Sequence, residues 1–121
     1  MSKMRVLIAD DSDIVRQGMV GLLSTEAGCY VCGEARNGAE TVQKATQLRP
    51  DLVLLDVSLP DINGLEVARR LRIEIPDAKI LIVSQHDPSR LLPRAIEAGA
   101  HGCLDKGSLG TELLPRIRAL T

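Results

Sequence analysis

The segment "LVLLDVSLPDINGLE" (residues 52–66) gives the clearest indication of how the chain folds. It begins with four consecutive apolar residues and continues with Asp56, and a proline and a glycine follow shortly after. A short, continuous apolar run of this kind is typical of a strand that is buried on both faces of a parallel sheet. No helix begins directly after Asp56, so this residue is not explained as a helix cap. The segment therefore predicts a buried strand that ends in a carboxylate.

The same pattern recurs along the chain. Apolar runs stand at 6–9, 30–32, 80–83 and 102–104, and stretches with helical periodicity separate them. Strands that alternate with amphipathic helices predict βα units and a parallel sheet. We therefore expect one α/β domain over residues 1–121, a (βα)5 three-layer sandwich with a five-stranded parallel sheet. The expected buried face of the first helix consists of Ile14, Val15, Gly18, Met19, Leu22 and Leu23.

Composition and charge narrow the function classes. The 121 residues are 45% hydrophobic, include one Tyr and no Phe or Trp, and carry a formal net charge of −1. This charge gives no electrostatic reason to expect direct binding to nucleic acid or to an acidic membrane. The apolar runs are far shorter than the roughly 20 residues that span a bilayer. Three cysteines without a secretory signal favour reduced thiols, so we expect a cytoplasmic protein.

Polar residues follow four of the five apolar runs. A single Asp after a strand usually caps a helix or stabilises a turn, but this explanation does not account for the whole set. In an open parallel sheet, the carboxyl ends of the strands form one edge, where ligands bind. We expect these side chains to converge there. They are Asp10 and Asp11 after the first run, Asp56 after the third, Ser84 after the fourth, and Asp105 and Lys106 after the fifth.

Three convergent carboxylates repel one another. Two like charges about 4 Å apart cost about 4 kcal/mol at an effective dielectric constant near 20. Protonation or a hard divalent cation with oxygen ligands would relieve this repulsion. Lys106 would supply a second positive charge, and Ser84 could donate a hydrogen bond to a small anion. The residue types therefore predict a phosphoryl-transfer site with a carboxylate nucleophile.

With these residues identified, the chain resembles the receiver domain of two-component response regulators over essentially its whole length. The motifs that carry the resemblance are "VLIADDSD", "LVLLDVSLPDINGLE", "ILIVS" and "AGAHGCLDK". The resemblance implies a flavodoxin-like fold with strand order 2-1-3-4-5. It also implies a signalling switch and not a turnover enzyme, because a receiver catalyses only its own phosphorylation and slow dephosphorylation.

The resemblance assigns a role to each site residue. Asp56 would be the phosphoacceptor, which takes its phosphoryl group from a sensor histidine kinase. Ser84 and Lys106 would contact the phosphoryl oxygens. Phosphorylation would shift the equilibrium of the face formed by the fourth helix, the fifth strand and the fifth helix, which is also a possible homodimer interface. The implied ligands of Mg²⁺ (or Mn²⁺) are Asp10, Asp11, Asp56 and the backbone carbonyl of Ser58.

Subfamily features point to the NarL/LuxR type. Lys106 is followed by Gly107, where many receivers have proline, and the segments "EARNGAE" and "DVSLPDINGLEVARRLR" resemble receivers that precede a LuxR-type helix-turn-helix. DNA would then be contacted only through an output domain outside this chain, and transcription would be the regulated output. Either the sequence is one part of a longer protein, which we favour, or the natural protein is a lone receiver.

Two positions depart from the family pattern. Cys103 and Ser84 are the switch positions, and Cys103 stands where the family usually has Tyr or Phe. We therefore expect a smaller or differently routed conformational change. Pro93 falls inside the expected fourth helix, where proline costs about 3 kcal/mol. We therefore expect that helix to be kinked or irregular until near Pro93, and residues 86–92 to be mobile or unusual.

Two other functions are open. A small metal-dependent phosphatase would also use Asp56 as nucleophile, but it commonly needs an acid/base carboxylate two residues later, where this chain has Ser58. A phosphorylation-independent interaction module on a receiver scaffold is the second alternative. Phosphomonoester turnover would identify the first, and failure to accept a phosphoryl group would identify the second.

Overall fold

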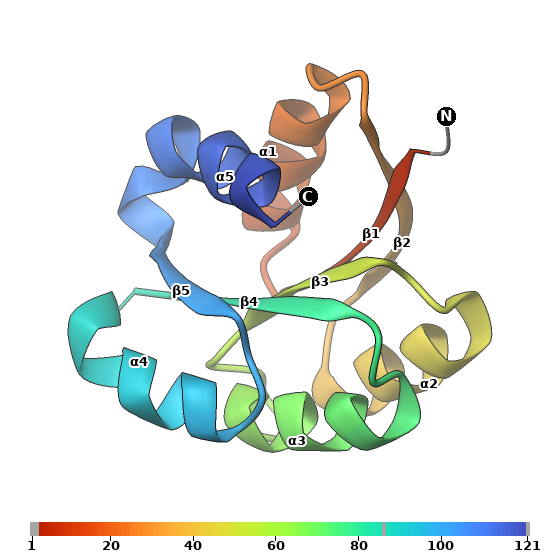
Figure 1. Ribbon diagram of the computed structural model, residues 1–121, viewed down its shortest axis with the longest axis vertical. Coiled ribbons are helices and arrows are strands. Elements are labelled where there is room, and N and C mark those ends of the chain that lie inside the picture. Colours follow the sequence, from red (N-terminus) through yellow and green to blue (C-terminus); the bar gives the residue numbers. More distant parts are fainter. Residues whose placement is uncertain (1–2, 86, 121) are drawn as a thin grey trace.

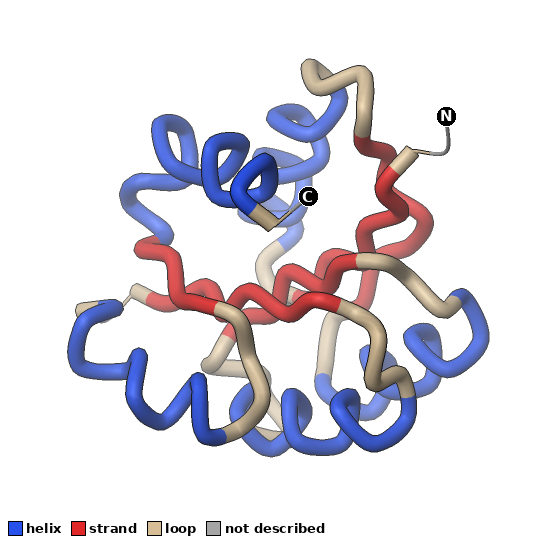
Figure 2. Tube along the Cα trace, viewed as in Figure 1, coloured by secondary structure: helices blue, strands red, loops and turns tan. Residues whose placement is uncertain are grey.

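The computed structural model describes residues 3–85 and 87–120. Five parallel strands form one sheet in the order β2-β1-β3-β4-β5, with helices on both faces (Figures 1 and 2). The predicted three-layer α/β fold and its strand order are confirmed. The elements are β1 (Met4–Ala9), α1 (Asp13–Ser24), β2 (Cys29–Ala35), α2 (Gly38–Leu48), β3 (Leu52–Asp56), α3 (Gly64–Glu74), β4 (Lys79–Ser84), α4 (Pro88–Glu97), β5 (Gly102–Asp105), a 3₁₀ turn η1 (Lys106–Ser108) and α5 (Leu109–Ala119).

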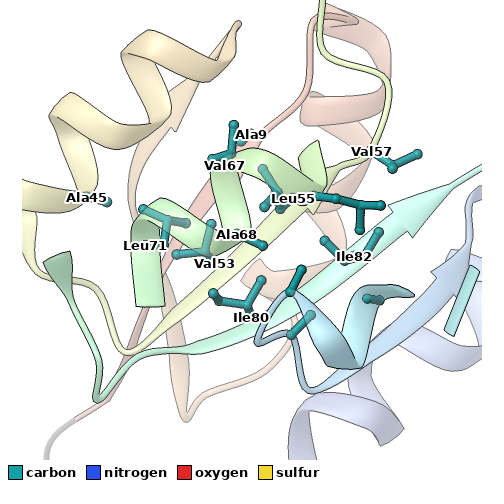
Figure 3. Packing of buried hydrophobic residues seen from close by; sticks show 14 of the residues in the cluster. Ala9, Ala45, Val53, Leu55, Val57, Val67, Ala68, Leu71, Ile80 and Ile82 are labelled. Atoms are coloured by element: carbon teal, nitrogen blue, oxygen red, sulfur yellow. The ribbon is translucent and has the colours of Figure 1, made fainter. Parts of the chain in front are cut away.

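The central strand β3 explains the apolar run from which the prediction started. Helices α1 and α5 cover one face of the sheet, and α2, α3 and α4 cover the other (Figure 1). Leu52 and Leu54 pack on the α1/α5 side, whereas Val53 and Leu55 pack on the opposite side. Figure 3 shows the packing around Val53 and Leu55. All four side chains are fully buried. Because both faces of β3 are covered, its sequence is apolar at every position and not at every second one.

No helix in the described part of the chain has the length and the hydropathy that a membrane span requires.

The prediction of which residues form the buried face of α1 is partly wrong. Ile14, which we expected to be buried, is 81% exposed, whereas Arg16 is only 6% exposed and lies on the buried side with Met19 and Leu23. An apolar pattern cannot identify a buried arginine, because the guanidinium is accepted in the interior only where specific oxygen partners surround it. Glu34 and the backbone of Asp10 provide such partners, as described below.

The expectation of an irregular α4 is also wrong for the described residues. The helix is continuous from Pro88 to Glu97 with Pro93 inside it. Proline fits the first helical position, and the Asp87 carboxylate caps the helix by accepting a hydrogen bond from the Ser89 amide at 3.0 Å. Pro93 and Ser89 are both exposed, so water can reach the carbonyl group that the missing amide leaves unbonded. His86, the first residue of the segment predicted to be unusual, lies outside the described residues.

Candidate functional site

Three carboxylates meet at the carboxyl edge of the sheet. Asp10 follows β1 and Asp56 ends β3; these strands are neighbours, with Ala9 opposite Leu55 in register. Asp10 is fully buried, Asp56 is 2% exposed, and Asp11 is exposed. One carboxylate oxygen from each of the three residues lies within 4.8 Å of the others. The predicted convergence of these residues is therefore observed.

The two buried carboxylates are held in the same way. The Ser12 amide donates to Asp10 Oδ1 at 2.9 Å, and the Ser58 amide donates to Asp56 Oδ1 at 3.0 Å. The second oxygen of each carboxylate, Oδ2, is buried and has no hydrogen-bond partner among the described residues. Because buried polar atoms are rarely left without a partner, these two oxygens mark a position that is suited to a cation or a reacting group.

Lys106 partly neutralises these oxygens. It is the first residue of η1, directly after β5, and its Nζ lies 2.9 Å from Asp10 Oδ2 and 3.3 Å from Asp56 Oδ2. Since neither Oδ2 accepts a well-directed hydrogen bond in the described structure, these contacts are ion pairs. Burial opposes the charge on Lys106, but Asp10 and Asp56 outweigh burial, and the pKa of Lys106 is raised. The ammonium group therefore stays charged at neutral pH.

The Asp56 carboxylate is destabilised in its ionised form. Its pKa is raised, mainly because burial removes it from water and in addition because Asp10 lies nearby; the Ser58 amide and Lys106 oppose the shift. One ammonium group does not balance three carboxylates. A small divalent cation with oxygen ligands fits this donor set and this charge. The contact observed for Ser58 is through its amide, and its carbonyl as a metal ligand stays a prediction.

The two switch positions lie on neighbouring strands. Ser84 is the last residue of β4, is fully buried, and lies opposite Asp105 of β5 in register. Val83, the residue before it, lies opposite Asp56, so Ser84 belongs to the same edge of the sheet as the acidic cluster. Cys103 lies opposite Ile82 and is a buried member of the core cluster between the sheet and α2–α4. The thiol occupies a core position, as a small apolar side chain would.

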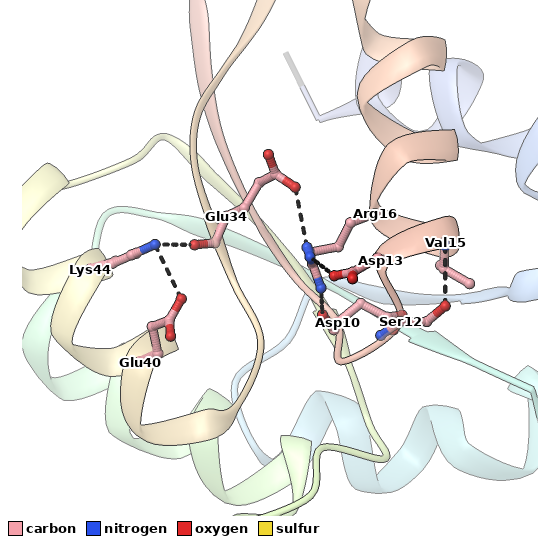
Figure 4. A network of polar contacts seen from close by, with 8 residues as sticks. All are labelled: Asp10, Ser12, Asp13, Val15, Arg16, Glu34, Glu40 and Lys44. Atoms are coloured by element: carbon pink, nitrogen blue, oxygen red, sulfur yellow. Dashed lines mark hydrogen bonds and ion pairs between the residues drawn. The ribbon is translucent and has the colours of Figure 1, made fainter.

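Sequence reasoning missed Arg16. Its Nη1 donates to the backbone carbonyl of Asp10 at 2.7 Å, its Nε donates to Glu34 Oε1 at 3.2 Å, and Nη2 pairs with Asp13 (Figure 4). The guanidinium thus ties the loop that carries Asp10 to both α1 and β2. A single arginine among apolar helical positions carries no sequence signal for this role.

The backbone of Asp56 is contacted closely by the start of α3. A Cβ atom on Gly64 would lie 2.4 Å from the Asp56 carbonyl oxygen and 2.6 Å from Val57 Cα, so only glycine fits there. The Gly64 amide also donates to the Val57 carbonyl at 2.9 Å. In the sequence, Gly64 stands out only as the glycine that follows shortly after Asp56. The structure adds that it fixes the distance between α3 and the end of β3.

Asp61 lies in the loop between β3 and α3, but its side chain binds a helix that precedes it in the chain. Its two carboxylate oxygens accept hydrogen bonds from the amides of Gly38, at 2.6 Å, and Ala39, at 3.0 Å. Asp61 therefore adds to the cap of α2, whose N-cap residue is Asn37, whereas Asn63 caps α3 by accepting from the Leu65 amide at 2.8 Å. The contact spans more than twenty positions in the sequence, so no local turn signal could predict it.

Comparison with known proteins agrees with this geometry. Residues 6–118 match the model of the response regulator receiver domain. The chain is 40% identical over 114 residues to response regulator GacA of Pseudomonas viridiflava, covering 94% of this chain and 53% of GacA. It is 38% identical to the DNA-binding transcriptional activator DevR/DosR of Mycobacterium tuberculosis, with 94% and 52% covered. The chain spans about half the length of the curated relatives it matches.

Solved structures give the same result. A LuxR-family two-component response regulator from Aurantimonas sp. SI85-9A1 superposes with a TM-score of 0.92 at 35% identity, covering 98% of this chain and 85% of that one. The signal receiver domain of a response regulator named NarL from Mycobacterium tuberculosis gives a TM-score of 0.91 at 33% identity, with 99% and 97% covered. The residues that match the family model include the acidic cluster and nearly all of the five-stranded sheet. The chain therefore belongs to the response regulator receiver domain family, and it is similar to the receivers of LuxR- and NarL-type regulators.

Proposed function

We propose that this domain is a phosphorylation-controlled switch in which Asp56 accepts a phosphoryl group from a sensor histidine kinase. The observation that carries the proposal is the buried Asp56 Oδ2, which has no hydrogen-bond partner among the described residues and lies 3.3 Å from the Lys106 ammonium. An oxygen in this state is available as a nucleophile. The Oδ1 atom is not equivalent, because the Ser58 amide occupies it at 3.0 Å.

The acidic cluster supports a divalent cation as cofactor. Asp10, Asp11 and Asp56, with the carbonyl of Ser58, would hold Mg²⁺ or Mn²⁺. When bound, the ion supplies positive charge that offsets the repulsion between the carboxylates and the incoming phosphoryl oxygens. Arg16 keeps the Asp10 backbone in place through its 2.7 Å hydrogen bond.

The chain's own residues each have a role in the transfer. Asp56 Oδ2 attacks phosphorus, the P–N bond to the donor histidine breaks, and its electron pair stays on the imidazole nitrogen. Lys106 exchanges a carboxylate partner for a phosphoryl oxygen, and its raised pKa keeps it charged during the exchange. The Ser84 hydroxyl would bind another phosphoryl oxygen. The product is one acyl phosphate per domain, which fits a switch and not a turnover enzyme.

The output would be read from the face formed by α4, β5 and α5. On α4, Leu92 is 40% exposed and Ile96 is 52% exposed, and this apolar surface supports a homodimer contact there. Cys103 replaces the usual aromatic switch residue, so we expect the face to shift less than in other receivers, or by another route. Since the matched relatives include the DNA-binding transcriptional activator DevR/DosR, of which this chain covers 52%, the regulated process would be transcription through a DNA-binding domain.

Phosphorylation from a small donor tests the proposal. The wild-type protein is incubated with Mg²⁺ and acetyl phosphate, and its intact mass is measured with and without base treatment. We expect a base-labile gain of one phosphoryl group that Asp56→Asn lacks and that EDTA prevents. An unmodified wild-type mass would favour the phosphorylation-independent interaction module, and a gain that survives in Asp56→Asn would assign the phosphoryl group to another residue.

A further inference from the structure

A second concave site lies beside the acidic cluster. It is a cleft of 790 Å³ formed by the loop after β3, the start of α3 and one side of α4. Ser58 and Ser84 line the end nearest the cluster, and Arg90 and Arg94 line the α4 side. The volume is within the range of small-molecule sites. The cleft also lies on a different part of α4 from the exposed Leu92 and Ile96, which do not line it.

The floor of the cleft is a part of the hydrophobic core that the helices leave slightly accessible. It consists of four apolar side chains, each of which is 8% exposed, while the other buried members of the same core cluster are at most 5% exposed. The remaining accessible apolar surface of this cluster is therefore concentrated in one place. A ligand that covered the floor would bury the surface that α3 and α4 leave open. The four side chains are Val57, Leu59, Leu65 and Leu91.

The rim of the cleft is positively charged. Arg90 and Arg94 are one helical turn apart, and neither guanidinium has a carboxylate partner within the described ranges 3–85 and 87–120. Asp87 also lines the cleft, but its carboxylate accepts hydrogen bonds from the Ser89 amide at 3.0 Å and the Ser89 hydroxyl at 2.8 Å. One carboxylate that already caps α4 faces two uncompensated guanidinium groups.

We infer that this cleft binds a small organic anion, whose apolar body covers the floor and whose carboxylate or phosphate pairs with Arg90 and Arg94. The planar guanidinium group matches both kinds of anion with two parallel hydrogen bonds. The floor adds affinity for an aromatic or branched body, which inorganic phosphate or acetate lacks. The inference goes beyond the proposed switch, because this binding requires neither a metal ion nor phosphorylation of Asp56.

An NMR titration without Mg²⁺ or a phosphodonor tests the inference. The probes are 2-naphthoate, 2-naphthyl phosphate and the neutral 2-naphthylmethanol, added to ¹⁵N-labelled protein. We expect saturable shift changes for the two anions, confined to the backbone amides of the non-proline residues 57–65, 84 and 87–94, which line or adjoin the cleft, and weaker binding of the neutral probe. Comparison of the two anions shows whether a carboxylate or a phosphate is preferred. Shift changes that do not saturate, or that centre on another surface, would overturn the inference.

A double variant checks the role of the rim. Replacing the exposed rim cations by Arg90→Gln and Arg94→Gln is expected to weaken both anions about tenfold while leaving the neutral probe unchanged. The matched control is Arg69→Gln with Arg70→Gln on α3, since these arginines pair with Glu66 and do not line the cleft. The control should bind all three probes as the wild type does. Equal weakening in both double variants, or none in the first, would contradict the inference.

Discussion

The two edges of the sheet use the same residue types in opposite ways. At the amino edge, Asp51 Oδ2 accepts from the Arg5 amide at 2.8 Å, and the Arg5 guanidinium donates to Tyr30 Oη at 3.1 Å and to the Arg49 carbonyl at 2.8 Å. At the carboxyl edge, the Oδ2 atoms of Asp10 and Asp56 are buried without a hydrogen-bond partner in the described structure.

This difference separates a structural edge from a reactive one. At the amino edge, the Asp51 carboxylate and the Arg5 guanidinium have internal hydrogen-bond partners, and these bonds contribute to stability. The carboxyl edge leaves charge uncompensated, which costs stability and creates a place for a cation and a phosphoryl group. Substitutions at corresponding positions of the two edges should therefore have opposite effects.

Gly64→Ala should be the most damaging single change. The added methyl group would meet the backbone of Asp56 at 2.4 Å, so the start of α3 must move away from the end of β3. We expect the free energy of unfolding to fall by about 3 kcal/mol and Mg²⁺ affinity to fall with it. Urea denaturation and calorimetric titration measure the two effects.

The control for this change is Gly21→Ala in α1, where nothing lies within 4 Å of the added carbon. That variant should be more stable by about 0.5–1 kcal/mol, because alanine favours a helix. A similar loss of stability in both variants would mean that the contact with Asp56 is not the cause.

Replacing one Asp at each edge by Asn should change stability in opposite directions. Without Mg²⁺, Asp56→Asn should raise the free energy of unfolding by about 1 kcal/mol, because burial raises the pKa of Asp56 and disfavours its ionised form at neutral pH. Asp51→Asn should lower it by about 0.5 kcal/mol, because the bond to the Arg5 amide loses its charge assistance. Urea denaturation at pH 7 measures both.

Adding Mg²⁺ gives an internal check on this pair. The ion should stabilise the wild type and Asp51→Asn to the same extent, and Asp56→Asn less, because a ligand of the ion has been removed. Destabilisation by Asp56→Asn in the absence of Mg²⁺ would show that the carboxyl edge is not strained.

The smallest expected effect is a pH dependence of stability that comes from His101 at the amino edge. His101 Nδ1 accepts a hydrogen bond from the Ile80 amide at 3.1 Å, and burial, with Lys79 and Arg72 nearby, lowers the pKa of His101 below the ordinary value for histidine. Below about pH 6.5 the unfolded chain takes up the proton more readily than the folded one. The stability should therefore fall as the pH is lowered through this range.

The variant His101→Asn isolates this contribution, because its amide oxygen can accept the same hydrogen bond but does not titrate. Thermal unfolding between pH 8 and pH 5 should show a smaller loss of stability for the variant than for the wild type. Identical pH profiles would assign the effect to other groups.

The sequence was sufficient for the features that depend on local periodicity and on strand ends. The run before Asp56 predicted a buried strand, and the positions of Asp10, Asp11 and Lys106 predicted one cluster, because parallel strands present their carboxyl ends on the same edge. The strand order itself came from resemblance to a known family. The structure bears out both the order and the cluster.

The features that sequence did not reveal depend on contacts between distant segments. Arg16 is buried because Glu34 and the Asp10 carbonyl surround it, and Asp61 caps a helix that precedes it in the chain. Pro93 is tolerated because it lies on the exposed side of α4, and burial is a property of the packed fold. Periodicity describes one helix or strand at a time, so it could not predict any of these three.

The position of a bound ion would show which edge of the sheet carries charge that the protein's own residues leave unbalanced. Crystals soaked in Mn²⁺ and measured at the manganese absorption edge would show each ion as an anomalous peak. We predict one strong peak, coordinated by carboxylate oxygens of Asp10, Asp11 and Asp56, and none at Asp51 or Asp77 of the amino edge. A peak at the amino edge, or an empty carboxyl edge at saturating Mn²⁺, would contradict the account.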